Sequence, residues 1–399
     1  MSYLTHLETE AGARLTADTP RNAVPGETLY ARYDLDRIRR EMSPRDFTQG
    51  PASLWRYAAL LPVAAPARAV TLGEGFTPLV PAPRIARALG LNRLDVKDEG
   101  RNPSGTFKDR GAAVAISRYV ELGVKTVAHN SSGNAGGSWS LYAARAGITC
   151  VNLLPTDVQP SSLQHCRASG QPAFLVKNWH DAGRFVAEAC ERHGWLNICT
   201  LKEPYRLEGK KTMGLEIAEQ LGWKMPAAIV YPMGGGLGAL AIWKAFEELL
   251  QLGWITGTPP RLYVTQFEGC APVVKAFAEG KDVCAPWGEI NIPPGGLRSP
   301  NPPGGRAVLA LMRKYGGAAI AVSTPEALAA VDELACEEGL FACPESATTL
   351  AGLRKAVALN MLRPDEHVII VNTGSGLKSI PTLATPHFPT LASSADIRV

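Results

Sequence analysis

Residues 102–111, with the sequence NPSGTFKDRG, open a predicted helix and place a lysine, Lys108, at its start. Gly111, Ala112 and Ala115 follow Lys108 at helical spacing, so the lysine shares a face with small apolar residues. Such a face packs closely against another element, and a lysine is rarely buried on it without a reason. The stretch therefore predicts a lysine with a special role.

The position of Lys108 at a helix start has a chemical consequence. The helix dipole disfavours a positive charge there, so the amine loses its proton more easily. A neutral amine is the form that condenses with an aldehyde cofactor to give a Schiff base. The alternative is a lysine whose ammonium group reaches solvent, and the helix pattern alone favours that alternative. Two further motifs favour the first interpretation, a Schiff base between Lys108 and an aldehyde cofactor.

The first of these motifs is the asparagine turn, residues 130–138, with the sequence NSSGNAGGS. It follows a predicted strand and precedes a predicted helix that Gly147 ends. A polar, glycine-rich turn in this position presents backbone N–H groups to a carboxylate or phosphate, and Asn134 is able to hydrogen-bond a ring hydroxyl. The alternative is an ordinary turn that uses glycine for its geometry.

The second motif is the glycine turn, residues 233–238, with the sequence MGGGLG, between a buried-looking strand and an amphipathic helix. Its four glycines make a cup of N–H donors for a phosphate dianion. Gly234, Gly236 and Ala239 also fit a loose dinucleotide fingerprint, which leaves a nicotinamide cofactor as an alternative. The acidic residue that this fingerprint needs, Glu268, comes later than expected.

From residue 72 the chain alternates between short apolar segments and amphipathic segments. The predicted strands are 93–97, 126–129, 149–154, 173–176, 196–200, 227–231, 261–266, 319–322 and 367–371. The predicted helices are 84–89, 107–122, 139–146, 181–193, 206–221, 239–252, 325–338 and 346–359. This alternation predicts parallel sheets covered by helices on both faces, with ligands beyond the carboxyl ends of the strands. Residues 1–70 are predicted to be irregular apart from a helix at 34–41, and 286–305 to be an ordered loop near the cleft.

Composition excludes several classes of protein. The 399 residues suffice for two lobes, and 46% hydrophobic with 20% charged residues is typical of globular proteins. A net charge of +4 without basic runs argues against a nucleic-acid partner. No apolar stretch is long enough to cross a bilayer, and the first residues lack a signal-peptide pattern. Eight cysteines without a C-x-x-C pair predict reduced thiols in a cytoplasmic protein and no metal site.

Together the three motifs resemble those of the fold type II pyridoxal-phosphate enzymes, the tryptophan synthase β-subunit superfamily. Within it the chain is most similar to the threonine synthases. The resembling segments are 73–79 (GEGFTPL), 102–111, 131–136, 204–212 (PYRLEGKKT) and 373–378 (TGSGLK). The resemblance implies an α/β fold of two doubly wound lobes with pyridoxal phosphate in the cleft between them. The small lobe would be 102–194, the large lobe 71–101 and 195–385, and 1–70 an extension packed on the large lobe of a homodimer.

The resemblance also implies roles for individual residues. Lys108 would form the Schiff base and then transfer protons. The other cofactor-binding residues would be Phe107, Asn134, Gly234, Gly235, Gly236, Leu237, Gly238 and Thr373. Substrate would bind in the asparagine turn at Ser132, Gly133, Asn134, Ala135 and Gly136, largely through backbone N–H groups, and its phosphate would bind to Arg206.

Three of these roles have plain structural alternatives. Thr373 could be an ordinary residue after a strand, and Phe107 could be part of the core. Arg206 could be paired with Glu208 at the start of a helix.

The activity implied is the conversion of O-phosphohomoserine and water to threonine and phosphate. Ala135, Leu201 and Glu203 depart from the threonine synthase pattern, and Glu203 would repel a phosphate. They favour a related lyase, which carries out α,β-elimination or β-replacement in the manner of serine/threonine dehydratases or diaminopropionate ammonia-lyases. Two more distant hypotheses are a nicotinamide oxidoreductase and a regulator without activity.

Overall fold

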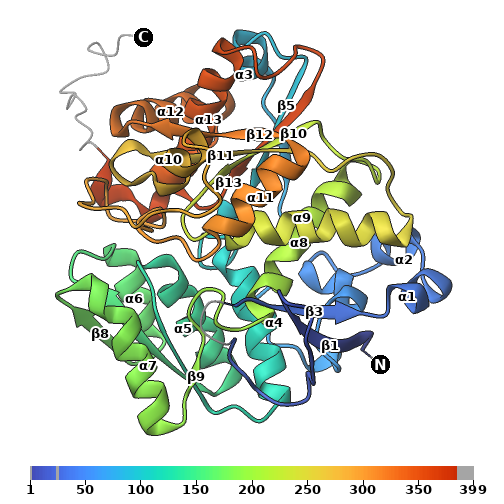
Figure 1. Cartoon of the computed structure of the whole chain (residues 1–399), viewed down its shortest axis with the longest axis vertical. Helices are drawn as coiled ribbons and strands as arrows, with labels where there is room; N and C mark the ends of the chain where they lie inside the picture. Colours follow the sequence, from blue (N-terminus) through green and yellow to red (C-terminus); the bar gives the residue numbers. More distant parts are fainter. Residues whose placement is uncertain (1, 24–26, 384–399) are drawn as a thin grey trace, which may run out of the picture.

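The computed structural model describes residues 2–23 and 27–383. Figure 1 shows two sheets with their helices, the smaller sheet at the lower left and the larger sheet above it. The larger sheet has the order β12-β11-β10-β13-β5-β4, and all its strands are parallel except β4 at the edge. Its strands are β4 (Leu79–Pro81), β5 (Arg93–Asp98), β10 (Ala228–Pro232), β11 (Arg261–Phe267), β12 (Gly317–Val322) and β13 (His367–Asn372).

Helices cover both faces of the larger sheet, as the alternation predicts. The helices around it are α3 (Pro83–Ala88), α8 (Tyr205–Gln220), α9 (Leu237–Leu252), α10 (Pro272–Ala278), α11 (Gly305–Tyr315), α12 (Thr324–Glu338) and α13 (Pro344–Ala358). Successive residues of β10 join different hydrophobic clusters. Ile229 and Tyr231 pack into the cluster that contains α8 and α9, whereas Ala228 and Val230 pack with α12 and α13. The fold class is therefore the predicted one.

The smaller sheet is entirely parallel and has the order β8-β7-β6-β9. Its strands are β6 (Thr126–Asn130), β7 (Thr149–Pro155), β8 (Ala173–Val176) and β9 (Leu196–Asn197). The accompanying helices are α4 (Lys108–Glu121), α5 (Asn134–Ala146), α6 (Pro160–Ala168) and α7 (Ala182–His193). Because β9 pairs with β6, this sheet extends just beyond the lobe boundary predicted at residue 194. The division into lobes otherwise stays a prediction.

The prediction that residues 1–70 are irregular is wrong. A three-stranded antiparallel sheet, β2-β1-β3, is formed by β1 (Leu4–Thr9), β2 (Arg14–Leu15) and β3 (Leu29–Tyr33). Two short helices follow, α1 (Leu35–Glu41), which overlaps the predicted helix, and α2 (Pro44–Thr48). Alternate residues of β3 are buried, and the hydroxyl of Tyr33 donates to Glu208 of α8 at 2.8 Å. The segment is thereby held against α8.

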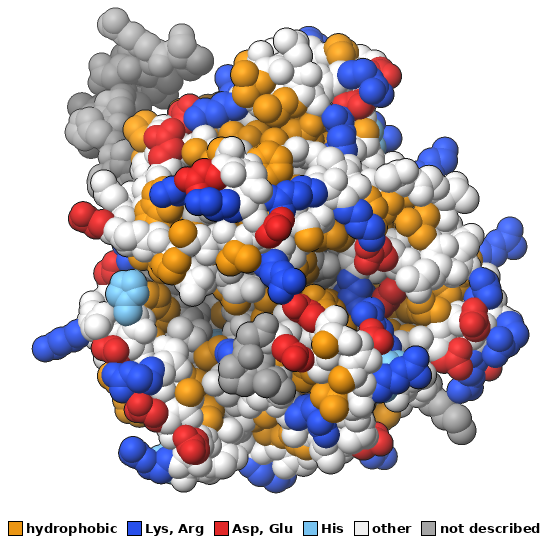
Figure 2. Space-filling model, viewed as in Figure 1, with side chains coloured by type: hydrophobic (Ala, Val, Ile, Leu, Met, Phe, Trp, Pro, Cys, Tyr) orange, Lys and Arg blue, Asp and Glu red, His pale blue; other side chains and the backbone are white. Residues whose placement is uncertain are grey.

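Short 3-10 helices connect the larger elements. They are η1 (Leu54–Leu60), η2 (Pro66–Arg68), η3 (Glu99–Arg101), η4 (Trp179–Asp181), η5 (Glu268–Cys270), η6 (Gly376–Lys378) and η7 (Ile380–Thr382). On the face in Figure 2, Lys and Arg side chains are interspersed with Asp and Glu. Residues 286–304 form a loop without helix or strand where an ordered loop is predicted for 286–305, and Leu297 in it is buried.

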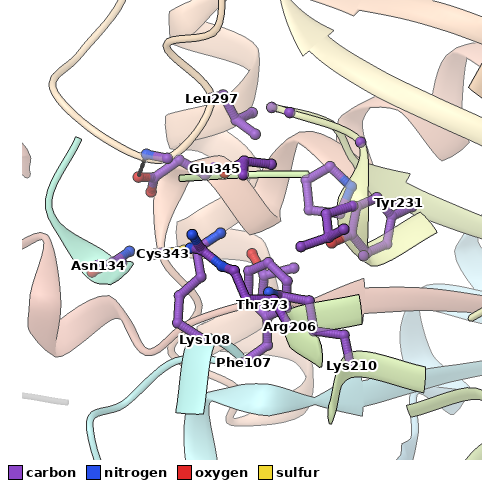
Figure 3. Close-up of a pocket in the computed structure, with 18 residues that line it drawn as sticks. Phe107, Lys108, Asn134, Arg206, Lys210, Tyr231, Leu297, Cys343, Glu345 and Thr373 are labelled. Carbon is purple, nitrogen blue, oxygen red and sulfur yellow. Dashed lines mark hydrogen bonds between the residues drawn. The ribbon is translucent and has the colours of Figure 1, made fainter. Parts of the chain in front are cut away.

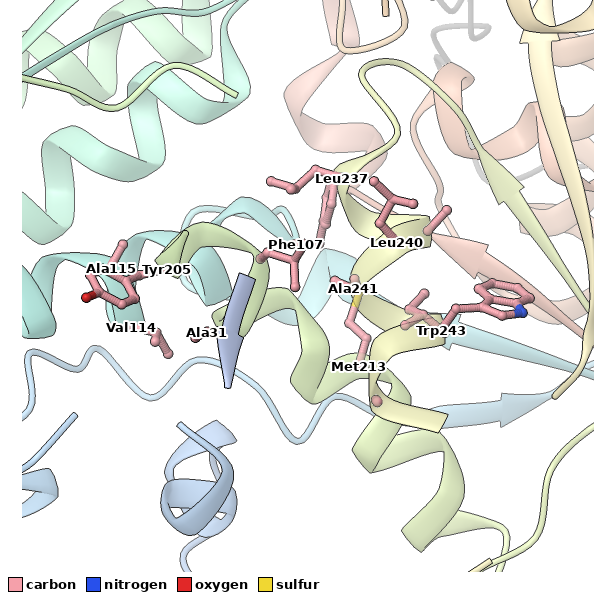
Figure 4. Packing of buried hydrophobic residues seen from close by; sticks show 14 of the residues in the cluster. Ala31, Phe107, Val114, Ala115, Tyr205, Met213, Leu237, Leu240, Ala241 and Trp243 are labelled. Atoms are coloured by element: carbon pink, nitrogen blue, oxygen red, sulfur yellow. The ribbon is translucent and has the colours of Figure 1, made fainter. Parts of the chain in front are cut away.

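Helix α4 lies in direct contact with α8. A side chain at Gly209 of α8 would place its Cβ 1.9 Å from the carbonyl oxygen of Arg110, so only glycine permits this approach. Ala112 and Ala115 of α4 are completely buried. Figure 4 shows the apolar packing that continues from α4 to α9, with Phe107 close to Leu237. Small residues thus bring the start of α4 against α8, as the spacing after Lys108 predicts.

A buried ionic cluster holds this contact in place. Arg110 donates to both oxygens of Glu99, at 2.6 and 2.7 Å, and to both oxygens of Glu216, at 2.5 and 2.7 Å. Lys97 of β5 donates to Glu216 at 2.7 Å. All four side chains are inaccessible to solvent. Because bidentate pairs fix both position and angle, the cluster sets where α4 begins, and with it Lys108.

Replacing Arg110 tests this role. Arg110→Met leaves Glu99 and Glu216 buried with Lys97 as the remaining cation, so we expect a loss of about 3–5 kcal/mol in the free energy of unfolding. Urea denaturation followed by circular dichroism measures it. The control is Arg39→Met, which removes an exposed pair with Asp36 and should leave the unfolding midpoint unchanged. Equal stability of the two variants would contradict the account.

Candidate active site

One pocket brings together most of the predicted site residues (Figure 3). Those that line it are Phe107, Lys108, Asn134, Arg206, Gly234, Gly235, Gly236, Leu237, Gly238 and Thr373. It lies at the carboxyl ends of β10 and β13, as expected for parallel strands. Ser132, Gly133, Ala135 and Gly136 lie in the adjacent turn and are not among the residues that line it.

Lys108 is the first residue of α4, and its amine faces the pocket. Its Nζ lies 4.0 Å from the centre of the Phe107 ring. Burial, and after it the positive charge of Arg206, lowers the pKa of Lys108 to about 7, with Glu345 and Cys343 acting in the opposite direction. The direction of the shift is the predicted one, and its largest cause is loss of hydration. A large fraction of Lys108 is therefore a free nucleophile at neutral pH.

The glycine turn joins β10 to α9 and has no room for a side chain at Gly234 or Gly238. A Cβ at Gly238 would lie 1.8 Å from the hydroxyl of Tyr231, and one at Gly234 would lie 2.3 Å from the carbonyl oxygen of Gly296. Gly236 caps α9 with a positive φ of 86°. Within the described ranges, the backbone N–H groups of residues 235–238 have no protein acceptor. These donors are available to bind an anion at the N-terminus of α9.

The asparagine turn offers fewer free donors than its sequence predicts. The hydroxyl of Ser131 accepts hydrogen bonds from the N–H groups of Gly133, at 3.1 Å, and Gly136, at 2.9 Å. Those two amides are thus used within the turn. The N–H groups of Ser132, Asn134 and Ala135 have no acceptor among the residues that the structure describes. The side chain of Asn134 lines the pocket directly.

Thr373 ties three elements together at the base of the pocket. Its hydroxyl lies 3.0 Å from the hydroxyl of Ser346 in α13, and its N–H donates to the same oxygen at 2.8 Å. Its carbonyl oxygen accepts from the N–H of Phe107 at 3.0 Å. Thr373 thus has structural contacts as well as a hydroxyl group at the pocket.

Arg206 lies in the first turn of α8 and is only 3% exposed. Its Nη1 donates to the carbonyl oxygen of Ile198, and its Nε is buried without an acceptor among the described residues. The alternative pairing with Glu208 is wrong, because Glu208 is paired with Lys211 and Lys244. Burial lowers the pKa of Arg206. Arg206 thus lines the pocket without a carboxylate partner among the described residues.

Glu203 is held in place at the start of α8. Its carboxylate accepts from the hydroxyl of Tyr119 at 2.5 Å and from the N–H groups of Tyr205 and Arg206 at 2.8 and 2.9 Å. It therefore caps the start of α8 and does not line the pocket. The expected repulsion of a phosphate stays a prediction, because Glu203 does not line the pocket but its charge acts on Arg206 and Lys210, which do.

Several residues that line the pocket were missed from the sequence: Thr200, Lys210, Tyr231, Pro232, Gly296, Leu297, Cys343 and Glu345. Lys210 had a signal, because it follows Arg206 by one helical turn and so shares its face. Glu345 had no such signal. Its carboxylate accepts from the N–H of Gly296 at 3.0 Å, across a contact between α13 and the 286–304 loop.

Parallel α/β sheets with a low-pKa lysine between two glycine-containing turns define a class of enzymes that bind an aldehyde cofactor with a phosphate group. The chain belongs to the family described as pyridoxal-phosphate dependent enzymes, which matches residues 70–374. It is 38% identical to a threonine synthase of Methanosarcina acetivorans over 88% of this chain and 86% of that one. It is 34% identical to a threonine synthase of Methanocaldococcus jannaschii over 88% of this chain and 87% of that one.

Solved structures share the fold. Diaminopropionate ammonia lyase from Escherichia coli superposes with a TM-score of 0.66 at 17% identity, over 78% of this chain and 87% of that one. Threonine deaminase isoform 2 from Solanum lycopersicum superposes with a TM-score of 0.65 at 20% identity, over 92% of this chain and 94% of that one. The chain is thus a fold type II pyridoxal-phosphate enzyme, a lyase similar to threonine synthases, and the dinucleotide and non-enzymatic hypotheses fall away. Among the described residues, none of the helices could span a membrane.

The pocket fits pyridoxal phosphate. The glycine turn leaves space and N–H donors for its phosphate, and Lys108 supplies an amine whose pKa of about 7 suits reaction with its aldehyde. Asn134 and Thr373 face the same space from different elements.

Gly238→Ala tests the glycine turn. The new methyl group would overlap the hydroxyl of Tyr231, so we expect cofactor affinity to fall at least about tenfold as the turn shifts. Spectroscopic titration of apoenzyme with pyridoxal phosphate measures the affinity. The control is Gly183→Ala in α7, where a Cβ meets no atom within 4 Å. Unchanged affinity in Gly238→Ala would show that the turn does not contact the cofactor.

The pKa of Lys108 gives a pH prediction. Below about pH 7 the amine is protonated and unreactive, and above it the amine is free. The rate at which apoenzyme takes up pyridoxal phosphate should therefore rise with pH and level off with a midpoint near 7. Stopped-flow absorbance measures the profile. A midpoint near the ordinary lysine value of 10.5 would contradict the structure.

Proposed function

We propose that this chain acts as a threonine synthase, which converts O-phosphohomoserine and water to threonine and phosphate. The observation that carries the proposal is Arg206, a buried arginine that lines the pocket and has no carboxylate partner among the described residues. A guanidinium fork suits a phosphate group on the substrate. The relatives that are threonine synthases support the same assignment.

Pyridoxal phosphate, when bound, supplies an aldehyde for attachment and a conjugated ring that withdraws electrons from the substrate's α-carbon. We infer that Lys108 Nζ is the attachment point and afterwards moves protons at the α- and β-carbons. The N–H groups of 235–238 would hold the cofactor phosphate, with Leu237 contributing through its backbone. Asn134 would bind the ring hydroxyl, and Thr373 would offer a neutral hydroxyl to the ring nitrogen.

We infer that the substrate carboxylate binds in the asparagine turn. The N–H groups of Ser132 and Ala135 are the donors that support this, since the N–H groups of Gly133 and Gly136 already donate to Ser131. Phe107 would pack beside the cofactor ring, and it is also part of the hydrophobic core that contains Leu237. Arg206 would bind the substrate phosphate.

The second candidate is α,β-elimination or β-replacement on a substrate without phosphate. Ala135 favours it, because it brings no hydroxyl group to the turn that receives the substrate. Such an enzyme would act on serine, threonine or diaminopropionate. Glu203, which favours it on sequence alone, does not line the pocket.

A paired assay separates the two. Purified protein with O-phosphohomoserine should release phosphate and threonine in equal amounts, and Lys108→Ala should lower this rate by at least about 10³-fold with an unchanged circular dichroism spectrum. The control is Lys125→Ala at an exposed lysine. Formation of 2-oxo acid from serine or threonine, without turnover of O-phosphohomoserine, would defeat the proposal.

We also propose a cytoplasmic homodimer, on the family resemblance alone. Light scattering of the purified protein would then give twice the 42.6 kDa mass of one chain, and a monomer mass would contradict this.

A further inference from the structure

Lys210 is a second lysine in the pocket that holds Lys108 (Figure 3). It is 2% exposed, and its Nζ makes no hydrogen bond to a described residue. Its Nζ lies 5.5 Å from the centre of the Phe107 ring and close to Gly111, whose Cβ position would be 2.9 Å away. Lys210 is thus a buried amine that the fold places at the pocket and leaves without an acceptor.

Other buried cations of the same region are paired. Lys211, the next residue of α8, lies 2.6 Å from Glu208 and 2.8 Å from Glu248. Lys244 also pairs with Glu208, at 2.9 Å. By contrast, no carboxylate oxygen of a described residue lies within 4.0 Å of the basic groups of Arg206 or Lys210. A buried cation without a counter-ion is strongly unfavourable, so a ligand anion is the natural partner for these two.

The nearby carboxylates are already used. Glu203 accepts from Tyr119 and from the first amides of α8, and Glu345 accepts from Gly296. Burial, and then the charges of Arg206 and Lys108, lowers the pKa of Lys210 well below its ordinary value, while Glu203 acts in the opposite direction. An arriving dianion would reverse the effect of those positive neighbours and favour protonation of Lys210.

We propose that Lys210, one helical turn after Arg206, completes a subsite for the dianionic leaving group of the substrate. This deepens the proposed function and rests on it. Arg206 grips the phosphate through its planar fork, and Lys210 adds a point charge that neutral or cationic side chains of a substrate cannot use. Lys210 thereby selects phosphorylated amino acids over serine, threonine or diaminopropionate.

Calorimetric titration of the holoenzyme with inorganic phosphate tests the subsite. Run at neutral pH in two buffers of different ionisation enthalpy, it should show proton uptake when phosphate binds. Lys210→Met should lose at least about tenfold in affinity together with the uptake. Lys210→Arg should keep the affinity but lose the uptake, because arginine is already protonated. Unchanged affinity and uptake in Lys210→Met would overturn the inference.

Thermal unfolding shows whether Lys210→Met is folded. It also tests whether Lys210 lacks a carboxylate partner. Lys210→Met removes a buried amine that has no partner among the described residues, so its Tm should equal or exceed that of the wild type. The matched control, Lys211→Met, removes a partner of Glu208 and Glu248 and should lower the Tm. A lower Tm for Lys210→Met than for Lys211→Met would contradict the absence of a partner for Lys210.

Further outcomes show whether Lys210 binds the phosphate of the substrate or that of the cofactor. They also show whether the subsite or the proposed function is at fault. If Lys210→Met loses pyridoxal phosphate on gel filtration while its affinity for inorganic phosphate is unchanged, Lys210 serves the cofactor and the inference fails. If wild type does not convert O-phosphohomoserine but the phosphate results hold, the proposed function fails and the subsite stands. If wild type and Lys210→Met convert O-phosphohomoserine with the same KM and bind inorganic phosphate equally well, the subsite proposal is contradicted. The proposed function is then retained.

Discussion

The bidentate pairing of Arg110 with Glu99 and Glu216 is the constraint on which the site depends. Glu99 follows strand β5, Glu216 belongs to α8, and Arg110 lies in the first turn of α4. One guanidinium group therefore fixes three elements at once, in a place from which water is excluded. Lys108 lies two residues before Arg110, so its amine has a defined position relative to the helix that carries Arg206.

Charge pairing separates two sets of buried basic residues around the site. Arg110, Lys97, Lys211 and Lys244 have carboxylate partners and hold helices and strands together. Lys108, Arg206 and Lys210 line the pocket, and burial lowers the pKa of each. The second group places basic residues where an anionic cofactor and an anionic substrate would meet, and such anions would favour their protonated forms.

Local patterns explain why much of the fold and site could be predicted. The alternation of apolar strands and amphipathic helices identified the parallel sheets, and two turns after strands brought Asn134 and the glycine turn to the pocket of Lys108. The β1–β3 sheet was missed because its strands are short and carry polar or charged residues such as Glu8, Arg14 and Arg32. Lys210 and Glu345 were missed because helix packing and the 286–304 loop decide which side chains reach the pocket. The orientation of Glu203 depends on the N–H groups of Tyr205 and Arg206, which donate to its carboxylate. Residue spacing in the sequence does not reveal these hydrogen bonds.

The most direct test is to find which lysine carries the cofactor. Borohydride reduction of the holoenzyme, followed by proteolysis and mass spectrometry, locates the phosphopyridoxyl group on the chain. The structure predicts it on Lys108, the half-buried amine at the start of α4. A modified Lys210, the other low-pKa lysine of the same pocket, or an unmodified chain would contradict the account.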